Sequence, residues 1–146
     1  GLRDQCARLG NNRGFITTVL GRKCRFNLFE PRFDRETPLP HSDALEKYGE
    51  DIKRAFTYKA MNRLIQGSAA DMTKKAMVEL YKEGILPHTQ IHDELDISVS
   101  SIEDCEKIIQ IMADCVPLVV PNKVDAEIGH SWGTAVENYK EFYNGR

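Results

Sequence analysis

The sequence predicts an α+β fold, in which an antiparallel sheet has a long helix and a second helix packed on one face. Three observations support this prediction. Apolar residues at helical spacing run through residues 51–83, and a second apolar helical pattern occupies 102–116. Between them, short strands flank the polar residues 92–94. At 146 residues the chain has the length of one domain with its own core.

Residues 1–26 are expected to form the end of a helix, a strand and a basic turn. The strand falls at 15–20, where β-branched and aromatic residues cluster. After a glycine come the cations Arg22, Lys23 and Arg25, next to a phenylalanine. Such a turn suits the passage of a phosphate backbone. It equally suits the charged edge of a hairpin, which discourages aggregation of sheets, and both interpretations stay open.

Residues 27–50 are expected to form an irregular and mobile loop. The segment holds three of the six prolines together with several carboxylates, a composition that interrupts regular elements. A short helical turn at 43–48 is the regular element expected within this loop.

The long helix at 51–83 has a basic first half and small residues in its middle. The stretch 66–70, Gln-Gly-Ser-Ala-Ala, allows another backbone or a ligand to approach closely. Asn62 and Gln66 are four residues apart, so both amides share one face of the helix. Amides in that position can hydrogen-bond the minor-groove acceptors of a nucleic acid. The alternative is close packing of the helix against a sheet, with the amides capping neighbouring groups.

The polar residues His92, Asp93 and Glu94 are placed at the tip of a hairpin. They lie between two short strands, the second of which alternates apolar and polar residues through 95–99. Two carboxylates at a tip repel each other and favour a nearby cation. Mg²⁺ is commonly held by one or two carboxylates together with substrate phosphates, so the tip is a candidate phosphoryl-transfer site. From these residues alone, a solvated turn is the simpler interpretation.

The last part of the chain is expected to contain a helix, a strand and a final helical turn. The helix begins after the N-cap Ser101 and ends at Pro117, with acidic residues in its first turn. Residues 123–128 alternate as a strand does, and aromatic residues beyond 136 are expected to dock the final turn.

Charge is divided unevenly along the chain, although the net charge is only −2. Residues 1–63 hold 13 Lys and Arg against 8 Asp and Glu, whereas residues 64–146 hold 7 against 14. This division fits a polyanion-binding surface beside a cation site, or two ordinary solvated faces. No apolar run approaches the length that spans a membrane. The four cysteines show no C-x-x-C spacing and are expected to be reduced thiols of an intracellular protein.

Two motifs, in this order and at this separation, resemble those of the family A DNA polymerases, the bacterial DNA polymerase I enzymes and their phage and organellar relatives. Residues 62–71, Asn-Arg-Leu-Ile-Gln-Gly-Ser-Ala-Ala-Asp, resemble the family's palm helix. Residues 90–95, Gln-Ile-His-Asp-Glu-Leu, resemble its motif C. Residues 14–26 are similar to the segment that returns from the fingers to the palm, and 119–132 to the closing strand and tryptophan. The resemblance covers nearly the whole chain.

The resemblance implies that residues 1–146 are the C-terminal part of a family A polymerase domain. They would divide into a fingers-to-palm return (1–26), the irregular loop (27–50), the palm core (51–135) and a tail (136–146). The implied activity is template-directed nucleotidyl transfer from dNTP to a primer 3′-hydroxyl, at a two-metal Mg²⁺ site that this chain holds only in part. The implied partners are primer-template DNA and dNTP, without a membrane. The setting would be the cytoplasm or nucleoid of a bacterial or phage-infected cell, or an organelle.

The resemblance also implies roles for individual residues. Asp93 matches the catalytic, metal-ligating aspartate of motif C, and Glu94 beside it has an accessory catalytic and metal-binding role. The other candidates share an implied contact with nucleic acid: His92, Gln66, Asn62, Arg63, Arg22 and Lys23. Of these, His92 would lie near the primer terminus and the two amides close to the insertion site. The three cations are the weaker candidates, for phosphate contact.

Some parts of the family pattern are not found in this sequence. The second metal-binding aspartate, from motif A, and the fingers helix that grips the triphosphate are expected N-terminal of Gly1. The chain is therefore expected not to polymerise alone, and to need the missing palm and fingers part as a partner. Cellular members carry an arginine near the position of Tyr58, so one DNA contact of the family is not expected here. The long proline-rich excursion at 27–50 indicates a phage-type enzyme.

Two other classes of function remain as alternatives. The first is a non-catalytic DNA-binding subunit, or relic of a split polymerase, which uses the basic half of the chain and does not need Asp93. The second is a small metal hydrolase that uses His88, His92, Asp93 and Glu94. A spacing of four suits two metal-binding histidines on a helix, but this stretch reads as a strand, which disfavours a zinc site.

Overall fold

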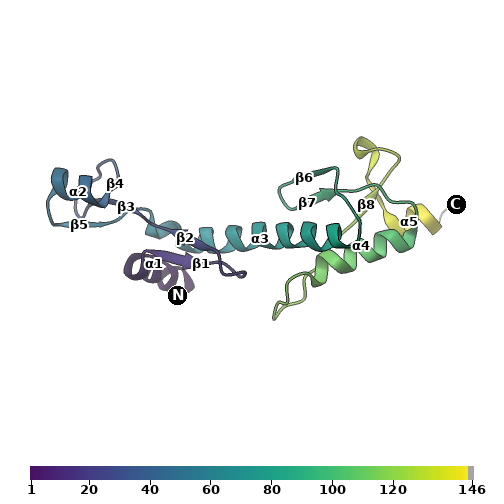
Figure 1. The fold of residues 1–146 in the computed structure, drawn as a ribbon, viewed down its shortest axis with the longest axis horizontal. Helices are drawn as coiled ribbons and strands as arrows, with labels where there is room; N and C mark the ends of the chain where they lie inside the picture. The colour runs from purple at the N-terminus through teal and green to yellow at the C-terminus, as the bar shows by residue number, and fades with distance from the viewer. Residues whose placement is uncertain (145–146) are drawn as a thin grey trace. The chain divides into compact units, whose positions relative to one another are not determined.

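The computed structural model of the chain describes residues 1–144, whose helices and strands are labelled in Figure 1. Two compact units are formed, Gly1–Asp71 and Met72–Arg146. The α+β class is confirmed, because helices combine with strands that pair antiparallel throughout the described residues. Those strands are divided among four small sheets, three of two strands and one of three.

The first unit begins with a helix and a hairpin. Helix α1 (Leu2–Arg13) ends at Gly14, whose φ of 74° is left-handed and whose N–H bonds the Gly10 carbonyl. Strand β1 (Phe15–Thr17) then pairs antiparallel with β2 (Lys23–Arg25). The expected strand is shorter than 15–20, because the chain turns at Thr18, where the Gly21 N–H bonds the Thr18 carbonyl at 2.9 Å.

The core of the first unit lies between α1, the hairpin and the start of α3 (Ala60–Lys82). Its members are buried residues that come from these three elements: Cys6, Ile16, Phe26 and Ala60. Gly10 completes the packing, since a Cβ on it would lie 3.1 Å from the Phe26 ring.

The structure differs from the irregular loop predicted at 27–50. Strand β3 (Leu28–Pro31) is the centre of a three-stranded antiparallel sheet, with β4 (Leu39–Pro40) on one side and β5 (Ile52–Arg54) on the other. Helix α2 (His41–Tyr48), which confirms the expected helical turn, packs against this sheet and buries Ala44. These strands have only two to four residues, and prolines stand at the ends of two of them, so no periodic pattern announces them.

The two ends of this inserted sheet and helix, residues 28–54, are tied together. The Ala55 N–H bonds the Leu28 carbonyl at 2.8 Å, and the Arg54 guanidinium bonds the Phe26 carbonyl at 2.9 Å. The Arg54 guanidinium also lies 4.8 Å from the centre of the Phe29 ring. The chain therefore leaves and re-enters the first unit at neighbouring points.

The long helix is shorter than the predicted 51–83. Strand β5 and a 3₁₀ turn, η1 (Thr57–Lys59), take up its expected first part, and α3 begins at Ala60. Between β5 and η1, Phe56 has a φ of 62°, a left-handed conformation that no right-handed α-helix contains. The pairing of β5 with β3 outweighs the local helical pattern there.

In the second unit, the end of α3 packs with α4 (Ile102–Asp114). The Cys115 thiol lies 3.7 Å from the Met72 carbonyl, and the Lys107 ammonium lies 2.9 Å from the Glu83 carboxylate. The predicted N-cap of α4 is confirmed, because the Ser101 hydroxyl accepts the Asp104 N–H at 3.2 Å.

The remaining elements of the second unit are short. Strands β6 (Thr89–Ile91) and β7 (Glu94–Asp96) form one hairpin, and β8 (Glu127–Ile128) pairs with β9 (Glu137–Asn138). The strand expected at 123–128 is thus reduced to two residues. A 3₁₀ turn, η2 (Trp132–Thr134), and helix α5 (Tyr139–Asn144) complete the part of the unit that the structure describes.

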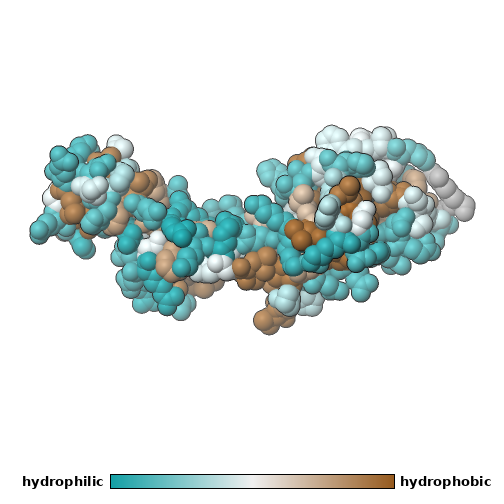
Figure 2. Space-filling view, in the orientation of Figure 1, coloured by the Kyte–Doolittle hydropathy of each residue, from teal (hydrophilic) through white to brown (hydrophobic). Residues whose placement is uncertain are grey.

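The loop that follows α4 has an apolar surface. Leu118, Val119 and Val120 are exposed, and Figure 2 shows the brown, hydrophobic surface that projects there. No helix among residues 1–144 is long and apolar enough to cross a membrane. All four cysteines are free thiols.

Candidate nucleic-acid and metal site

The tip of the β6–β7 hairpin is a two-residue loop. Ile91 pairs with Glu94, so His92 and Asp93 form the connection between the strands. His92 has a φ of 54°, whereas Asp93 is not left-handed. A positive φ at the first loop position alone is the pattern of a type II′ turn, in which glycine is usual at that position.

Both carboxylates at the tip are exposed to solvent. Within residues 1–144, the structure records no ion pair or hydrogen bond that engages the side chain of Asp93 or Glu94. Oxygen ligands of this kind are those that Mg²⁺ prefers. The same part of the chain contains no group of three or more His, Cys, Asp or Glu side chains that could hold a metal ion. Asp93 and Glu94 therefore fit Mg²⁺ as part of a ligand set and do not complete one.

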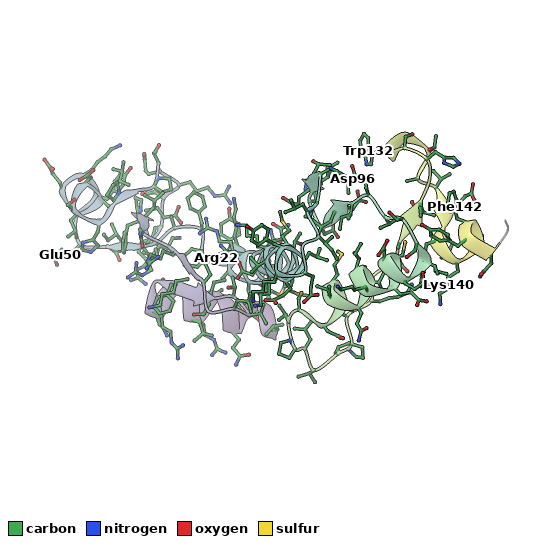
Figure 3. All side chains as sticks on the ribbon, turned by 45° about the vertical axis from the view of Figure 1, so that its right-hand side comes forward. Arg22, Glu50, Asp96, Trp132, Lys140 and Phe142 are labelled. Atoms are coloured by element: carbon green, nitrogen blue, oxygen red, sulfur yellow. The ribbon has the colours of Figure 1, made fainter. Side chains whose placement is uncertain are left out.

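The base of the hairpin is closed by contacts between the strands. The His88 ring Nε2 lies 2.8 Å from the Ser98 hydroxyl, and the His88 N–H bonds the Asp96 carbonyl at 2.8 Å. Asp96, at the end of β7, can be followed in Figure 3. His88 thus takes part in strand pairing at the base, while His92 is at the tip, so the two do not form the helical pair of ligands that a zinc hydrolase would use.

The amides predicted to contact nucleic acid are in the first unit, on the first turns of α3. Asn62 and Gln66 are both exposed, and the described residues provide no hydrogen-bond partner for either side chain. Their spacing of four places them on one face of a regular helix, as the sequence predicts. Two free amides on one exposed face are able to donate to and accept from a ligand.

The cations predicted to contact phosphate differ in the hydrogen bonds and ring contacts that they already make within the chain. Lys23 is exposed, and its ammonium lies 4.6 Å from the centre of the Phe15 ring. The Arg63 guanidinium, by contrast, donates to the Arg25 carbonyl at 3.0 Å and lies 4.7 Å from the centre of the Phe26 ring. Lys23 is therefore the cation with the fewest internal contacts.

Arg22 is engaged by a buried carboxylate. Its Nε lies 2.7 Å from Oδ1 of Asp71, whose side chain is only 7% exposed. The hydrogen bond to Asp71 raises the pKa of the Arg22 guanidinium above its ordinary value, with burial acting in the opposite direction. The Thr18 hydroxyl donates to the other carboxylate oxygen of Asp71. Figure 3 shows where Arg22 lies in the first unit.

Sequence reasoning missed Asp71 and Thr18 as functional candidates. The available signal is the position of Asp71, a single acid four residues after Gly67 on a helix turn otherwise made of small residues. A lone carboxylate on such a face requires a cationic partner if the face is buried. The partner lies 49 residues earlier, so its identity is not readable from local spacing.

The predicted site residues fall into two groups. His92, Asp93 and Glu94 share the hairpin tip of the second unit. The amides and the cations share the α3 and hairpin surface of the first unit. That these two groups face one DNA duplex remains a prediction.

Comparison with known proteins identifies a family to which most of the chain matches. The family model described as DNA polymerase family A matches residues 2–134. A DNA-directed DNA polymerase of Pseudomonas phage M6 is 39% identical over 132 residues, which is 90% of this chain and 17% of that protein. The thermostable DNA polymerase I of Thermus aquaticus is 31% identical over 136 residues, which is 88% of this chain and 14% of that protein.

A solved structure of a DNA polymerase domain is also similar to this chain. The POL domain of Pol1 from M. smegmatis, in complex with DNA primer-template and dNTP, matches with a TM-score of 0.65 and 27% identity. The match covers 92% of this chain and 23% of that one. This chain therefore spans less than a quarter of the length of each of these relatives. The family match extends over almost the whole chain, and we conclude that the chain belongs to DNA polymerase family A.

Proposed function

We propose that this chain is the C-terminal palm portion of a template-directed DNA polymerase. The observation that carries the proposal is the exposed Asp93–Glu94 pair on a two-residue hairpin loop, inside a chain that matches family A from residue 2 to 134. In the complete protein, the reaction is transfer of a nucleotidyl group from dNTP to a primer 3′-hydroxyl.

Asp93 is proposed as a ligand of Mg²⁺, with Glu94 in an accessory role. Bound Mg²⁺ would supply a Lewis acid that lowers the pKa of the attacking hydroxyl and neutralises charge on the phosphates. The chain's own contribution is to hold the Asp93 carboxylate at the end of two paired strands, where its backbone is fixed on both sides. A rigid ligand loses little conformational entropy when a metal binds.

The first unit is proposed to hold the primer-template. The unpartnered amides of Asn62 and Gln66 can hydrogen-bond the minor-groove edges of base pairs, and His92 of the second unit would lie at the primer end. Lys23 offers a phosphate contact, whereas Arg22 and Arg63 would offer one only by leaving their internal partners. The M. smegmatis neighbour was solved with DNA primer-template and dNTP, which supports these partners for the present chain.

The second metal-binding aspartate and the dNTP-gripping helix are proposed to come from the rest of the polymerase. Under this proposal the 146 residues alone do not extend a primer, and the complete enzyme works inside a cell. The small metal hydrolase is less favoured, because His88 takes part in strand pairing at the base of the hairpin while His92 lies at its tip.

A segment exchange tests the proposal. Residues 2–134 replace the matching segment of the Pseudomonas phage M6 polymerase, and primer extension is measured with Mg²⁺ present. We expect the hybrid to extend primers, and Asp93→Ala to reduce the rate by roughly 10³-fold, because loss of a metal ligand removes several kcal/mol of transition-state stabilisation. Asp125→Ala is the matched control, since Asp125 is an exposed acid of the same unit whose ion pair, among residues 1–144, is with neighbouring Lys123.

The same experiment distinguishes a catalytic polymerase segment from a non-catalytic DNA-binding subunit. An Asp93→Ala hybrid that extends primers as fast as the Asp125→Ala hybrid would refute the catalytic role and favour the non-catalytic module. Binding of a primer-template duplex by each hybrid is measured in parallel, so that a loss of synthesis with retained binding is assigned to the metal site.

A further inference from the structure

The turn at residues 18–22 is held against one turn of α3, Gly67 to Asp71, by hydrogen bonds. We call this set of contacts the grip. The Thr18 hydroxyl donates to Asp71, and the Val19 N–H donates to the Ser68 hydroxyl at 3.1 Å. The Arg22 guanidinium donates through Nε to Asp71 at 2.7 Å and through a terminal nitrogen to the Gly67 carbonyl at 2.8 Å. Four hydrogen bonds therefore join segments that are 45 to 53 residues apart in sequence.

Gly67 is what permits this close approach. A Cβ at residue 67 would lie 2.9 Å from the Thr18 methyl carbon and 3.3 Å from a terminal nitrogen of Arg22. The first distance is shorter than van der Waals contact, so any larger residue would push the turn away from the helix. Two of the small residues in the middle of α3, Gly67 and Ser68, thus serve packing of the turn, in line with the packing interpretation of the sequence.

The ion pair is asymmetric in exposure, and this fixes the role of Arg22. The Asp71 side chain is 7% exposed, whereas that of Arg22 is 48% exposed. A buried carboxylate is strongly destabilised if its cationic partner leaves. Rotation of the Arg22 side chain toward a phosphate would break its hydrogen bonds to both Asp71 and the Gly67 carbonyl. The Arg22 backbone N–H is also held, by the Thr18 hydroxyl at 3.1 Å.

Gln66 shares this helix turn. It precedes Gly67 directly and is exposed, so the orientation of its amide follows the position of the backbone that Arg22 and Asp71 hold. Lys23 follows Arg22 directly and is exposed with no ionic partner recorded in the described residues. The grip therefore fixes the backbone beside two candidate DNA-contacting residues, Gln66 on α3 and Lys23 after the turn.

We propose that Asp71 is a positioning residue that fixes the turn 18–22 on α3 through its hydrogen bonds with Arg22 and Thr18. The fixed turn in turn positions the side chains of Gln66 and Lys23 for contact with the DNA duplex. Arg22 serves this grip and does not contact phosphate, whereas Lys23 does. The DNA part of this inference rests on the proposed function, and the grip itself does not.

The salt dependence of DNA binding separates a phosphate contact from a positioning role. Duplex binding by the 146-residue chain is measured over a range of salt for the wild type, Arg22→Gln and Lys23→Gln. Loss of one phosphate contact reduces the slope of log K against log salt by about 0.9. We expect this reduction for Lys23→Gln, and for Arg22→Gln a weaker affinity with an unchanged slope. A reduced slope for Arg22→Gln would overturn the assignment of Arg22.

A double-mutant cycle tests the grip without DNA. The unfolding midpoints of Arg22→Gln, Asp71→Asn and the double variant are compared with the wild type. We expect the double variant to lose clearly less than the two single losses together, because Gln and Asn can still hydrogen-bond each other. The control cycle uses Arg32 and Asp51, an ion pair of 2.8 Å that is exposed on both sides and should be nearly additive.

The outcomes keep the two proposals apart. Additive losses in the Arg22 and Asp71 cycle would refute the grip, whether or not the chain binds DNA. A wild-type chain that binds no duplex, together with strong coupling in the cycle, would refute the proposed function and retain the grip. If Asp71→Asn does not fold, Thr18→Val removes the hydrogen bond to Asp71 and the acceptor of the Arg22 N–H at almost constant shape. A midpoint equal to the wild type would then count against the grip.

Discussion

Gln90 holds the backbone of His92 at the tip of the β6–β7 hairpin, where its side-chain amide donates to the His92 carbonyl. This hydrogen bond spans two residues and helps to retain a left-handed conformation, φ 54°, that histidine rarely adopts. Local strain of this kind is kept where the surrounding structure determines it, and it is common at functional sites.

His92→Gly is expected to keep or slightly raise the free energy of unfolding, because glycine adopts a positive φ without steric cost. His92→Val is expected to lower it by about 1–2 kcal/mol, since a β-branched residue is strained in the left-handed region. Urea unfolding measures both. If His92 also contacts the primer end, the His92→Gly form of the hybrid polymerase will lose primer extension despite its stability.

Gly67→Ala is expected to destabilise the chain by about 1–3 kcal/mol, because its Cβ would overlap the Thr18 methyl group. Gly133→Ala is the matched control, since nothing lies within 4 Å of a Cβ there, and its change should stay within about 0.5 kcal/mol. Equal midpoints for the two variants in thermal unfolding would contradict the close packing described for α3.

The stability of the chain is expected to fall at acid pH partly because of Glu79. Hydrogen bonds from Lys75, and then from Lys82, hold the pKa of this carboxylate below its ordinary value. A lowered pKa stabilises the folded state above the pKa of the unfolded chain, and this contribution is lost as pH falls through the folded value.

The free energy of unfolding, measured from pH 7 to pH 3, is therefore expected to fall less steeply for Glu79→Gln than for the wild type. Glu106→Gln on α4 is the control, because it removes an exposed carboxylate of the same unit. Parallel curves for the wild type and Glu79→Gln would show that the lysine contacts are not kept in solution.

Cys105 and Cys115 are expected to react slowly with iodoacetamide. Burial raises the pKa of both thiols, and the thiolate is the reactive form. Cys24 and Cys115 are both half-buried, whereas Cys105 is buried, so Cys105 should be labelled more slowly than Cys24 at pH 8. Mass spectrometry after short pulses gives the order of labelling, and labelling in urea, where all four should react alike, is the control. Labelling of Cys105 as fast as Cys24 would contradict its burial.

Those parts of the fold that depend on local signals were predictable from the sequence. Ser101 begins α4 because its hydroxyl caps the first turn, an interaction that needs only the next three residues. The β6–β7 hairpin and the shared face of Asn62 and Gln66 likewise follow from periodicity over a few residues.

The parts that were missed depend on partners distant in sequence. The segment at 28–54 folds because β3 finds strands on both sides of it, one of them 20 or more residues away. The same pairing removes the first part of the expected long helix. At the site, Arg22 looked like a free cation because its partner Asp71 lies 49 residues later, and no local pattern announces that contact.

The inserted sheet and helix at 28–54 leave and rejoin the first unit at the hydrogen bond between Ala55 and Leu28. A chain that closes on itself at such a junction is modular. Since Arg54 is the residue of this segment that bonds the Asn11 and Phe26 carbonyls, we expect insertions elsewhere in the segment to leave the helix that carries Gln66 folded.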